Sequence, residues 1–209
     1  MITRIVLGIA TAAFSGAAAL AGPAPDDRAS EAAAERWGDD VAKVEPLKDA
    51  RTDRVLKGLR LHRVLVRNPR AAVAGPDFFR HALALGGPKP VYVTTDADAA
   101  ALIASRKPVV TEETSTLDLV LVFARLRDYE QLTAPPPLAP GERPEDRGPT
   151  RPEDWKTVTE KTEAGHEVEC TLLTDPVITL CSRYRFIMPA DGGFTVKRLR
   201  TVLMTNAYD

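Results

Sequence analysis

The residues best suited to binding chemistry are four arginines on two neighbouring predicted strands near the C-terminus. Arg183 and Arg185 alternate on one strand. Arg198 and Arg200 alternate on the next. An even register would place the four side chains opposite one another on one face, with His166 of the preceding strand facing Arg185. Opposed guanidinium groups repel each other unless an anion lies among them, and guanidinium binds phosphate or carboxylate through paired hydrogen bonds. These five residues are the candidate anion-binding site.

Two other arrangements fit the same arginines. Carboxylates from the N-terminal half of the chain, or water alone, would satisfy the guanidinium groups without any ligand. A shift of one residue at the turn formed by Gly192 and Gly193 would turn side chains to opposite faces and disperse the cluster. The predicted anion site therefore depends on the register of one hairpin.

No catalytic motif accompanies this cluster. The three histidines are isolated, and the sequence has no Gly-x-Ser-x-Gly elbow, His-Glu-x-x-His helix or phosphate-binding glycine loop. Asp96 and Asp98 suit the first turn of a helix better than a cation site. His166 with Cys170 supplies too few ligands for zinc. We therefore expect no metal and no cofactor, although the many carboxylates leave a glycosidase-like acid pair open.

The two cysteines, Cys170 and Cys181, lie close together in the sequence and flank a predicted turn. A four-residue loop over residues 174–177 would pair Leu173 with Ile178 and therefore place Cys170 directly opposite Cys181. Directly opposed residues of a hairpin lie within the range that a disulfide tolerates. The spacing therefore predicts a disulfide that fixes the register and leaves no nucleophilic thiol.

Residues 1–21 have the pattern of a cleavable export signal. Arg4 precedes an apolar run, and the run ends in Ala19-Leu20-Ala21, which a signal peptidase accepts. An uncleaved anchor would need about 20 strongly apolar residues, and this run is shorter and rich in Ala and Gly. We expect cleavage before Gly22, a periplasmic or secreted protein, and no integral membrane segment after cleavage. A disulfide is consistent with that compartment.

The composition narrows the class of partner. The formal net charge is −1, which argues against nucleic-acid binding because such domains are usually clearly basic. Abundant Ala, Arg and Pro is typical of a GC-rich bacterial genome. We expect the partner to be a protein or an anionic component of the envelope.

The N-terminal part of the chain divides into a polar leader over residues 22–50 and an α/β half over residues 51–133. A short peripheral helix over Arg28–Trp37 is one interpretation of the leader, but its polar composition favours a solvated segment that joins the signal to the domain. Arginine and lysine recur in residues 51–70 at helical spacing, but residues 59–66 also read as a strand, and the two alternatives stay open. The other predicted elements are a helix over 78–85, a strand over 91–93, a helix from the Thr95-x-x-Asp98 capping box to about Ser105, and a strand over 117–127.

The C-terminal part begins with a Pro-rich loop or linker over residues 134–153. Residues 154–209 then alternate runs rich in Val, Thr, Ile and aromatic residues with turns that contain Gly, Asp or Pro. This pattern predicts an antiparallel β-meander with strands over 155–162, 166–173, 177–188 and 194–205.

The sequence as a whole predicts an α+β fold. A C-terminal antiparallel meander with one hairpin disulfide would carry a helical and short-stranded N-terminal half on one face, and the meander would form one domain with residues 51–133. The expected core side chains of the meander are Ile178, Leu180, Tyr184, Phe186, Leu199 and Leu203. We expect a non-enzymatic periplasmic or secreted binding protein. The alternatives are a small extracytoplasmic hydrolase with a carboxylate site, or a structural envelope component with the Pro-rich segment as a spacer.

Overall fold

The computed structural model describes residues 27–69, 71, 77–111, 114–138, 143, 147, 150–175 and 179–205. The predicted export signal and its cleavage site lie outside the described residues. So do Ile178 and part of the predicted Pro-rich loop.

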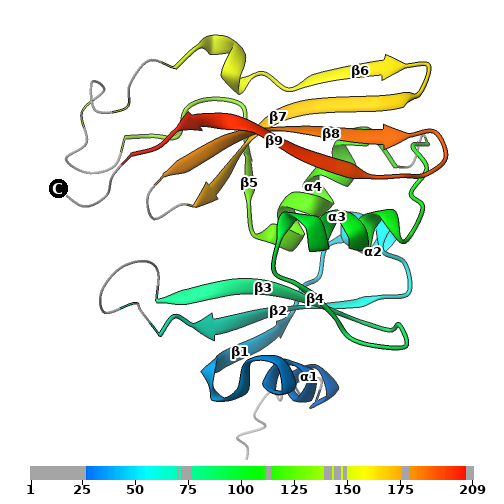
Figure 1. Ribbon diagram of the computed structural model, residues 1–209, viewed down its shortest axis with the longest axis vertical. Coiled ribbons are helices and arrows are strands. Elements are labelled where there is room, and N and C mark those ends of the chain that lie inside the picture. Colours follow the sequence, from blue (N-terminus) through cyan, green and yellow to red (C-terminus); the bar gives the residue numbers. More distant parts are fainter. Residues whose placement is uncertain are drawn as a thin grey trace, which may run out of the picture.

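The molecule is built in four layers, visible from bottom to top in Figure 1. Helix α1 (Asp27–Trp37) covers one face of a four-stranded sheet. Three helices form the middle layer, and a five-stranded sheet forms the top layer. The fold is therefore mixed α and β with antiparallel sheets, as the sequence predicts.

The lower sheet has the order β1-β2-β3-β4, and every neighbouring pair is antiparallel. Its strands are β1 (Val41–Pro46), β2 (Arg60–Arg67), β3 (Phe78–Leu85) and β4 (Val91–Val93). For residues 51–70 the helix and the strand interpretations are each correct in part, because a helix, α2 (Ala50–Val55), precedes strand β2. Residues 27–46 of the predicted leader supply α1, a short 3₁₀ turn over Gly38–Asp40, and the edge strand β1.

The predicted helix over residues 78–85 is wrong, because this segment is strand β3 in the middle of the lower sheet. Its side chains alternate between two buried environments. Ala82 and Ala84 pack in the central core, whereas Leu83 and Leu85 pack on the side of α1. A strand buried on both faces reads as a continuous apolar run, which by periodicity alone also fits a helix.

The middle layer contains α2, α3 (Asp96–Ala104) and α4 (Thr116–Arg127). The capping box predicted for α3 is confirmed: the Asp98 amide donates to Thr95 Oγ1 at 3.1 Å, and the Thr95 amide donates to Asp98 Oδ2 at 2.8 Å. A second capping box, between Ser115 and Asp118, starts α4.

The predicted strand over residues 117–127 is wrong, because this segment is α4. Leu119, Val120, Val122, Phe123 and Leu126 are all buried, so the helix is apolar almost all round. Such a pattern is typical of a helix enclosed by other layers. The two-sided apolar character of this segment therefore comes from its place between two sheets (Figure 1).

The upper sheet has the order β5-β7-β8-β9, and β6 also pairs with β7. The predicted meander is confirmed in β6 (Val158–Thr162), β7 (Gly165–Asp175), β8 (Leu180–Pro189) and β9 (Thr195–Leu203). The short strand β5 (Glu130–Leu132) follows α4 and extends the sheet along β7. A 3₁₀ turn over Pro152–Trp155 leads into β6.

The predicted disulfide is not present: Cys170 and Cys181 are both free and buried. The hairpin pairs Leu173 with Cys181 and Cys170 with Tyr184, because its connection lies later than predicted, between Asp175 and Leu180, and the register shifts between Leu173 and Asp175. The register differs from the predicted one by three residues, an odd number, which sends the two thiols to opposite faces of the sheet. Cys170 packs in the central core, on the inner face of the upper sheet, which is the face towards the middle layer. Cys181 packs with Trp155 on the opposite, outer face.

The central core lies between the upper sheet and the middle layer. Tyr184 and Phe186 belong to it as predicted, and they contact the ring of Phe123 from α4. Leu203 is buried on the outer face instead, with Cys181. Leu180 and Leu199 are half-buried. None of the helices in the described part of the chain is both long and apolar enough to span a membrane.

Candidate functional site

The structure divides the predicted anion-binding residues between the two faces of the upper sheet. Arg183 pairs with Arg200, but a bulge in β9 follows, so that Arg198 pairs with Tyr184 on the inner face. His166 pairs with Met188, whose side chain belongs to the central core, rather than with Arg185. Arg183, Arg185 and Arg200 therefore share the outer face, while Arg198 and His166 share the inner one.

Arg183 is buried, and its guanidinium is held by acceptors of the protein itself. Its Nη1 donates to the carbonyl oxygens of Asp154 at 3.0 Å and Lys156 at 2.9 Å. Its Nε donates to Glu169 Oε2 at 3.3 Å. This side chain therefore fastens the 3₁₀ turn before β6 onto the outer face of the sheet.

The other two arginines of the outer face also have carboxylate partners. Arg185 pairs with Glu169 at 2.7 Å, and Arg200 pairs with Asp154, whose side chain is almost fully buried. Burial by itself would raise the pKa of Glu169, but the hydrogen bonds and charges of Arg185 and Arg183 outweigh burial and lower it. Anion binding by this cluster stays a prediction, and an anion there would compete with these carboxylates.

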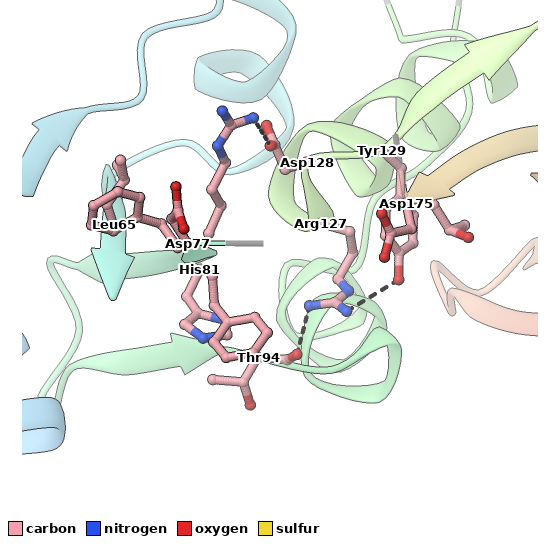
Figure 2. Close-up of a pocket in the computed structure, with 12 residues that line it drawn as sticks. Leu65, Asp77, His81, Thr94, Arg127, Asp128, Tyr129 and Asp175 are labelled. Atoms are coloured by element: carbon pink, nitrogen blue, oxygen red, sulfur yellow. Dashed lines mark hydrogen bonds and ion pairs between the residues drawn. The ribbon is translucent and has the colours of Figure 1, made fainter. Parts of the chain in front are cut away.

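A hollow of about 490 Å³ lies elsewhere, between the two sheets at the C-terminal end of α4. An adjoining hollow of about 470 Å³ shares five of its lining residues. We call the two together the interlayer cleft. The lining residues of the first hollow, drawn in Figure 2, are Leu65, Asp77, Phe78, Phe79, Arg80, His81, Thr94, Arg127, Asp128, Tyr129, Thr174 and Asp175.

Arg127, the last residue of α4, fixes the wall of the cleft from the middle layer. Its guanidinium donates to Asp96 Oδ1 at 2.8 Å, to the carbonyl of Thr94 at 2.6 Å and to the hydroxyl of Tyr129 at 3.1 Å. Figure 2 shows the bonds to Thr94 and Tyr129. The guanidinium also lies 5.1 Å from the centre of the Tyr129 ring. Three acceptors and one ring hold this side chain in a single orientation.

The Asp96 carboxylate accepts hydrogen bonds from three side chains. Besides Arg127, the hydroxyl of Tyr129 donates to its Oδ1 at 3.0 Å and the hydroxyl of Tyr184 donates to its Oδ2 at 3.1 Å. Burial raises the pKa of both phenols, and the negative charge of Asp96 raises each further. Both tyrosines therefore remain protonated and donate to the Asp96 carboxylate.

A second ion cluster closes the cleft on the side of the lower sheet. Asp128 is the residue that follows α4 and caps its C-terminal end. It adopts a left-handed conformation with φ of 58°, which Asp tolerates. The Asp128 carboxylate pairs with Arg80 at 2.8 Å and with Arg63. These pairs join strands β2 and β3 of the lower sheet to the end of α4.

The rim of the cleft is aromatic. Phe78 and Phe79 are 41 % and 43 % exposed, although both are large apolar residues. Next to them, the ring of His81 stacks on Trp37 with centroids 5.4 Å apart. Burial and the charge of Arg127 lower the pKa of His81, so the imidazole is neutral near pH 7. Its Nδ1 is buried without a hydrogen-bond partner among the described residues, so a ligand group in the cleft can supply one.

Apart from Arg198, which lines the second hollow, the sequence did not single out the residues that make this cleft. Asp96 had a role only in capping α3, and Arg127 was assigned to a strand. Tyr184 contacts Asp96 across 88 positions, and no motif spacing reports such a contact. In the part of the chain that the structure describes, no group of three or more His, Cys, Asp or Glu side chains is placed so that it could hold a metal ion.

Comparison with known proteins gives no functional lead, since no protein-family model, curated protein or solved structure matches this chain. Function is therefore inferred from the chemistry of the cleft.

Proposed function

We propose that this protein is an exported, non-enzymatic binding protein that holds its ligand in the interlayer cleft. The observation that carries the proposal is the network of Arg127, Tyr129 and Tyr184 around Asp96, which holds the polar wall of the cleft rigid. Preformed, concave sites with apolar walls and a few fixed polar groups are typical of ligand binding. Rigidity also lowers the conformational entropy lost when a ligand binds.

The same network favours binding over acid–base catalysis. A general base needs a free lone pair and a pKa near the working pH. Asp96 already accepts from three donors, one of them cationic, and burial raises the pKa of Tyr129 and Tyr184 away from neutrality. Groups held in this way orient a ligand through fixed charges and dipoles.

Export is part of the proposal and rests on residues 1–21. We propose a periplasmic or secreted protein whose mature chain begins at Gly22, and whose partner is an exported or envelope component. Mass spectrometry of the protein produced in a bacterial host should find Gly22 as the N-terminal residue of the exported form. An intact Met1 on a membrane-bound product would contradict this part.

Binding in the cleft is tested by nuclear magnetic resonance with a fragment library. We expect fragments with an aromatic ring and a polar group to shift the amide signals of Thr94, Arg127, Tyr129 and Asp175. In the variant Leu65→Trp, a larger side chain occupies part of the hollow, and these shifts should be lost. The matched control is Val158→Trp, which alters an exposed residue of β6 that lines neither hollow. Equal fragment binding by both variants would show that the cleft is not the site.

A further inference from the structure

The first hollow of the cleft runs along the edge of strand β3. Four consecutive residues, Phe78, Phe79, Arg80 and His81, all line it. Successive side chains of a strand point to opposite faces of its sheet. Arg80 lies opposite Leu65, on the face towards α4, whereas His81 lies opposite Val64, on the face towards α1. A single hollow that contacts side chains on both faces of the sheet must pass around the edge of the strand.

The strand register shows that this edge is open. On one side, β2 pairs with β3 over its whole length, from residue 78 to residue 85. On the other side, β4 pairs only with residues 82–84. Within the described part of the chain, residues 78–81 therefore have no strand neighbour on the side where the hollow lies. At 3.3–3.4 Å per residue, this open edge is about 13 Å long.

We propose that an extended polypeptide segment of a partner occupies this open edge as an added strand, continuing the line of β4. This inference rests on the proposed function of the cleft and names the class of its ligand. A segment added to a sheet edge gains affinity from main-chain hydrogen bonds, and its alternate side chains enter pockets on either side. Unpaired strand edges are natural templates for such pairing.

The side chains around the edge define the chemistry of the segment. Towards α4, a side chain of the segment meets Phe78, Leu65 and the ring of Tyr129. Towards α1, a side chain meets Phe79 and the neutral ring of His81. Apolar or aromatic residues at alternate positions fit both sides. The two exposed phenylalanines, at 41 % and 43 %, would become buried by such a segment.

A free segment fits this place better than a second copy of the chain. Thr94, Arg127 and Asp175 close the hollow opposite the edge, which leaves about 490 Å³. That space lies between two layers of the same molecule, so a single extended strand can enter it. The sheet edge of a second copy would bring the other layers of that copy into collision with the upper sheet.

The experiment begins with a displayed library of random heptapeptides. Peptides are selected on the parent protein and counter-selected on Leu65→Trp, with Val158→Trp as the matched control. Selected peptides are then synthesised with an N-methyl group on each backbone amide in turn. In an added strand, alternate amides face the template. Methylation at every second position should therefore weaken binding about tenfold, and the positions between should change little.

Each result decides between defined outcomes. Cleft-dependent peptides with the alternating pattern support the inference. Cleft-dependent peptides without alternation, or fragment binding in the cleft when the selection yields no cleft-dependent peptide, overturn the added strand but leave cleft binding intact. If neither fragments nor peptides bind in the cleft, both the proposed function and the added strand are overturned. Slow hydrogen exchange at those amides of residues 78–81 that point away from β2, measured in the free, full-length protein, would show that a segment of the chain itself covers the edge, and would also overturn the inference.

Discussion

Tyr184 and Asp96 lie 88 positions apart in the chain, and the phenol of the first donates to the carboxylate of the second at 3.1 Å. The bond joins strand β8 of the upper sheet to the first turn of α3 in the middle layer. Arg127 and Tyr129 donate to the same carboxylate, so the end of α4 is tied to the same point. The geometry of the cleft therefore depends on one aspartate that three segments share.

Removal of the Tyr184 hydroxyl should destabilise the fold measurably. A hydrogen bond to a charged group contributes about 1.5–3 kcal/mol, and we expect Tyr184→Phe to lower the free energy of unfolding by an amount near the lower end, because Asp96 is partly exposed to water. The control is Tyr92→Phe, which removes a bond to the neutral carbonyl of Ala32 and should cost about 0.5–1.5 kcal/mol. Urea unfolding measures both, and a smaller effect for Tyr184→Phe would contradict the role of Asp96.

Two neighbouring arginines of β8 should differ sharply in their effect on stability. The Arg183 side chain is 7 % exposed, and its loss leaves the Lys156 carbonyl without its donor and removes one donor each from Glu169 and the Asp154 carbonyl, so Arg183→Met should cost about 3 kcal/mol. Arg185 is 44 % exposed and pairs with the same Glu169, so Arg185→Met should lower the unfolding free energy much less than Arg183→Met does. Similar losses in thermal and urea unfolding would show that Arg183 acts only as a surface charge.

Melting curves in sulfate and chloride at equal ionic strength test anion binding by the arginines. An anion site on the upper sheet predicts that sulfate raises the melting temperature more than chloride does, following ligand concentration over the dissociation constant. Because Arg183, Arg185 and Arg200 already have carboxylate or carbonyl partners, we expect equal shifts for the two salts. A sulfate-specific shift that Arg200→Ala removes would instead establish the anion site.

Acid should weaken the outer face of the upper sheet. The pKa of Glu169 is lowered in the folded state: burial opposes the shift, and Arg185 and Arg183 impose it. A carboxyl group with a lowered folded pKa contributes stability above its unfolded pKa of about 4.3, and this contribution is lost as the pH falls through the folded value. We expect the contribution of Glu169 to the unfolding free energy to be level above about pH 5 and to decline below it. The decline should be shallower in Glu169→Gln, and an unchanged slope would contradict the pairing.

The two thiols should be free but unreactive in the folded protein. Burial raises the pKa of Cys170 to about 12 and that of Cys181 to about 11, so very little thiolate exists at pH 8. We expect a thiol reagent to label neither cysteine in the native, exported protein and to label both after unfolding without reductant. If unfolding in the absence of reductant releases no thiol, the cysteines form a disulfide after all.

Much of the fold could be read from the sequence because its signals are local. The Thr95-x-x-Asp98 pattern predicts the start of α3, since its hydrogen bonds span only four residues. The alternation of apolar residues and turns likewise predicts the meander, and its strands lie within a few residues of their expected places. Such signals specify the type of an element wherever one face is buried and the other is not.

Tertiary structure alone decided the elements that are buried on both faces. In α4 and β3 the apolar residues surround the element, so periodicity no longer distinguishes a helix from a strand. The position of the connection between β7 and β8, together with the register shift between Leu173 and Asp175, decided which residues face Cys170 and Cys181, because an odd shift exchanges the faces. The cleft itself requires Asp96 of α3, Arg127 of α4 and Tyr184 of β8 to meet. Only the packing of the middle layer against the upper sheet brings these three residues together.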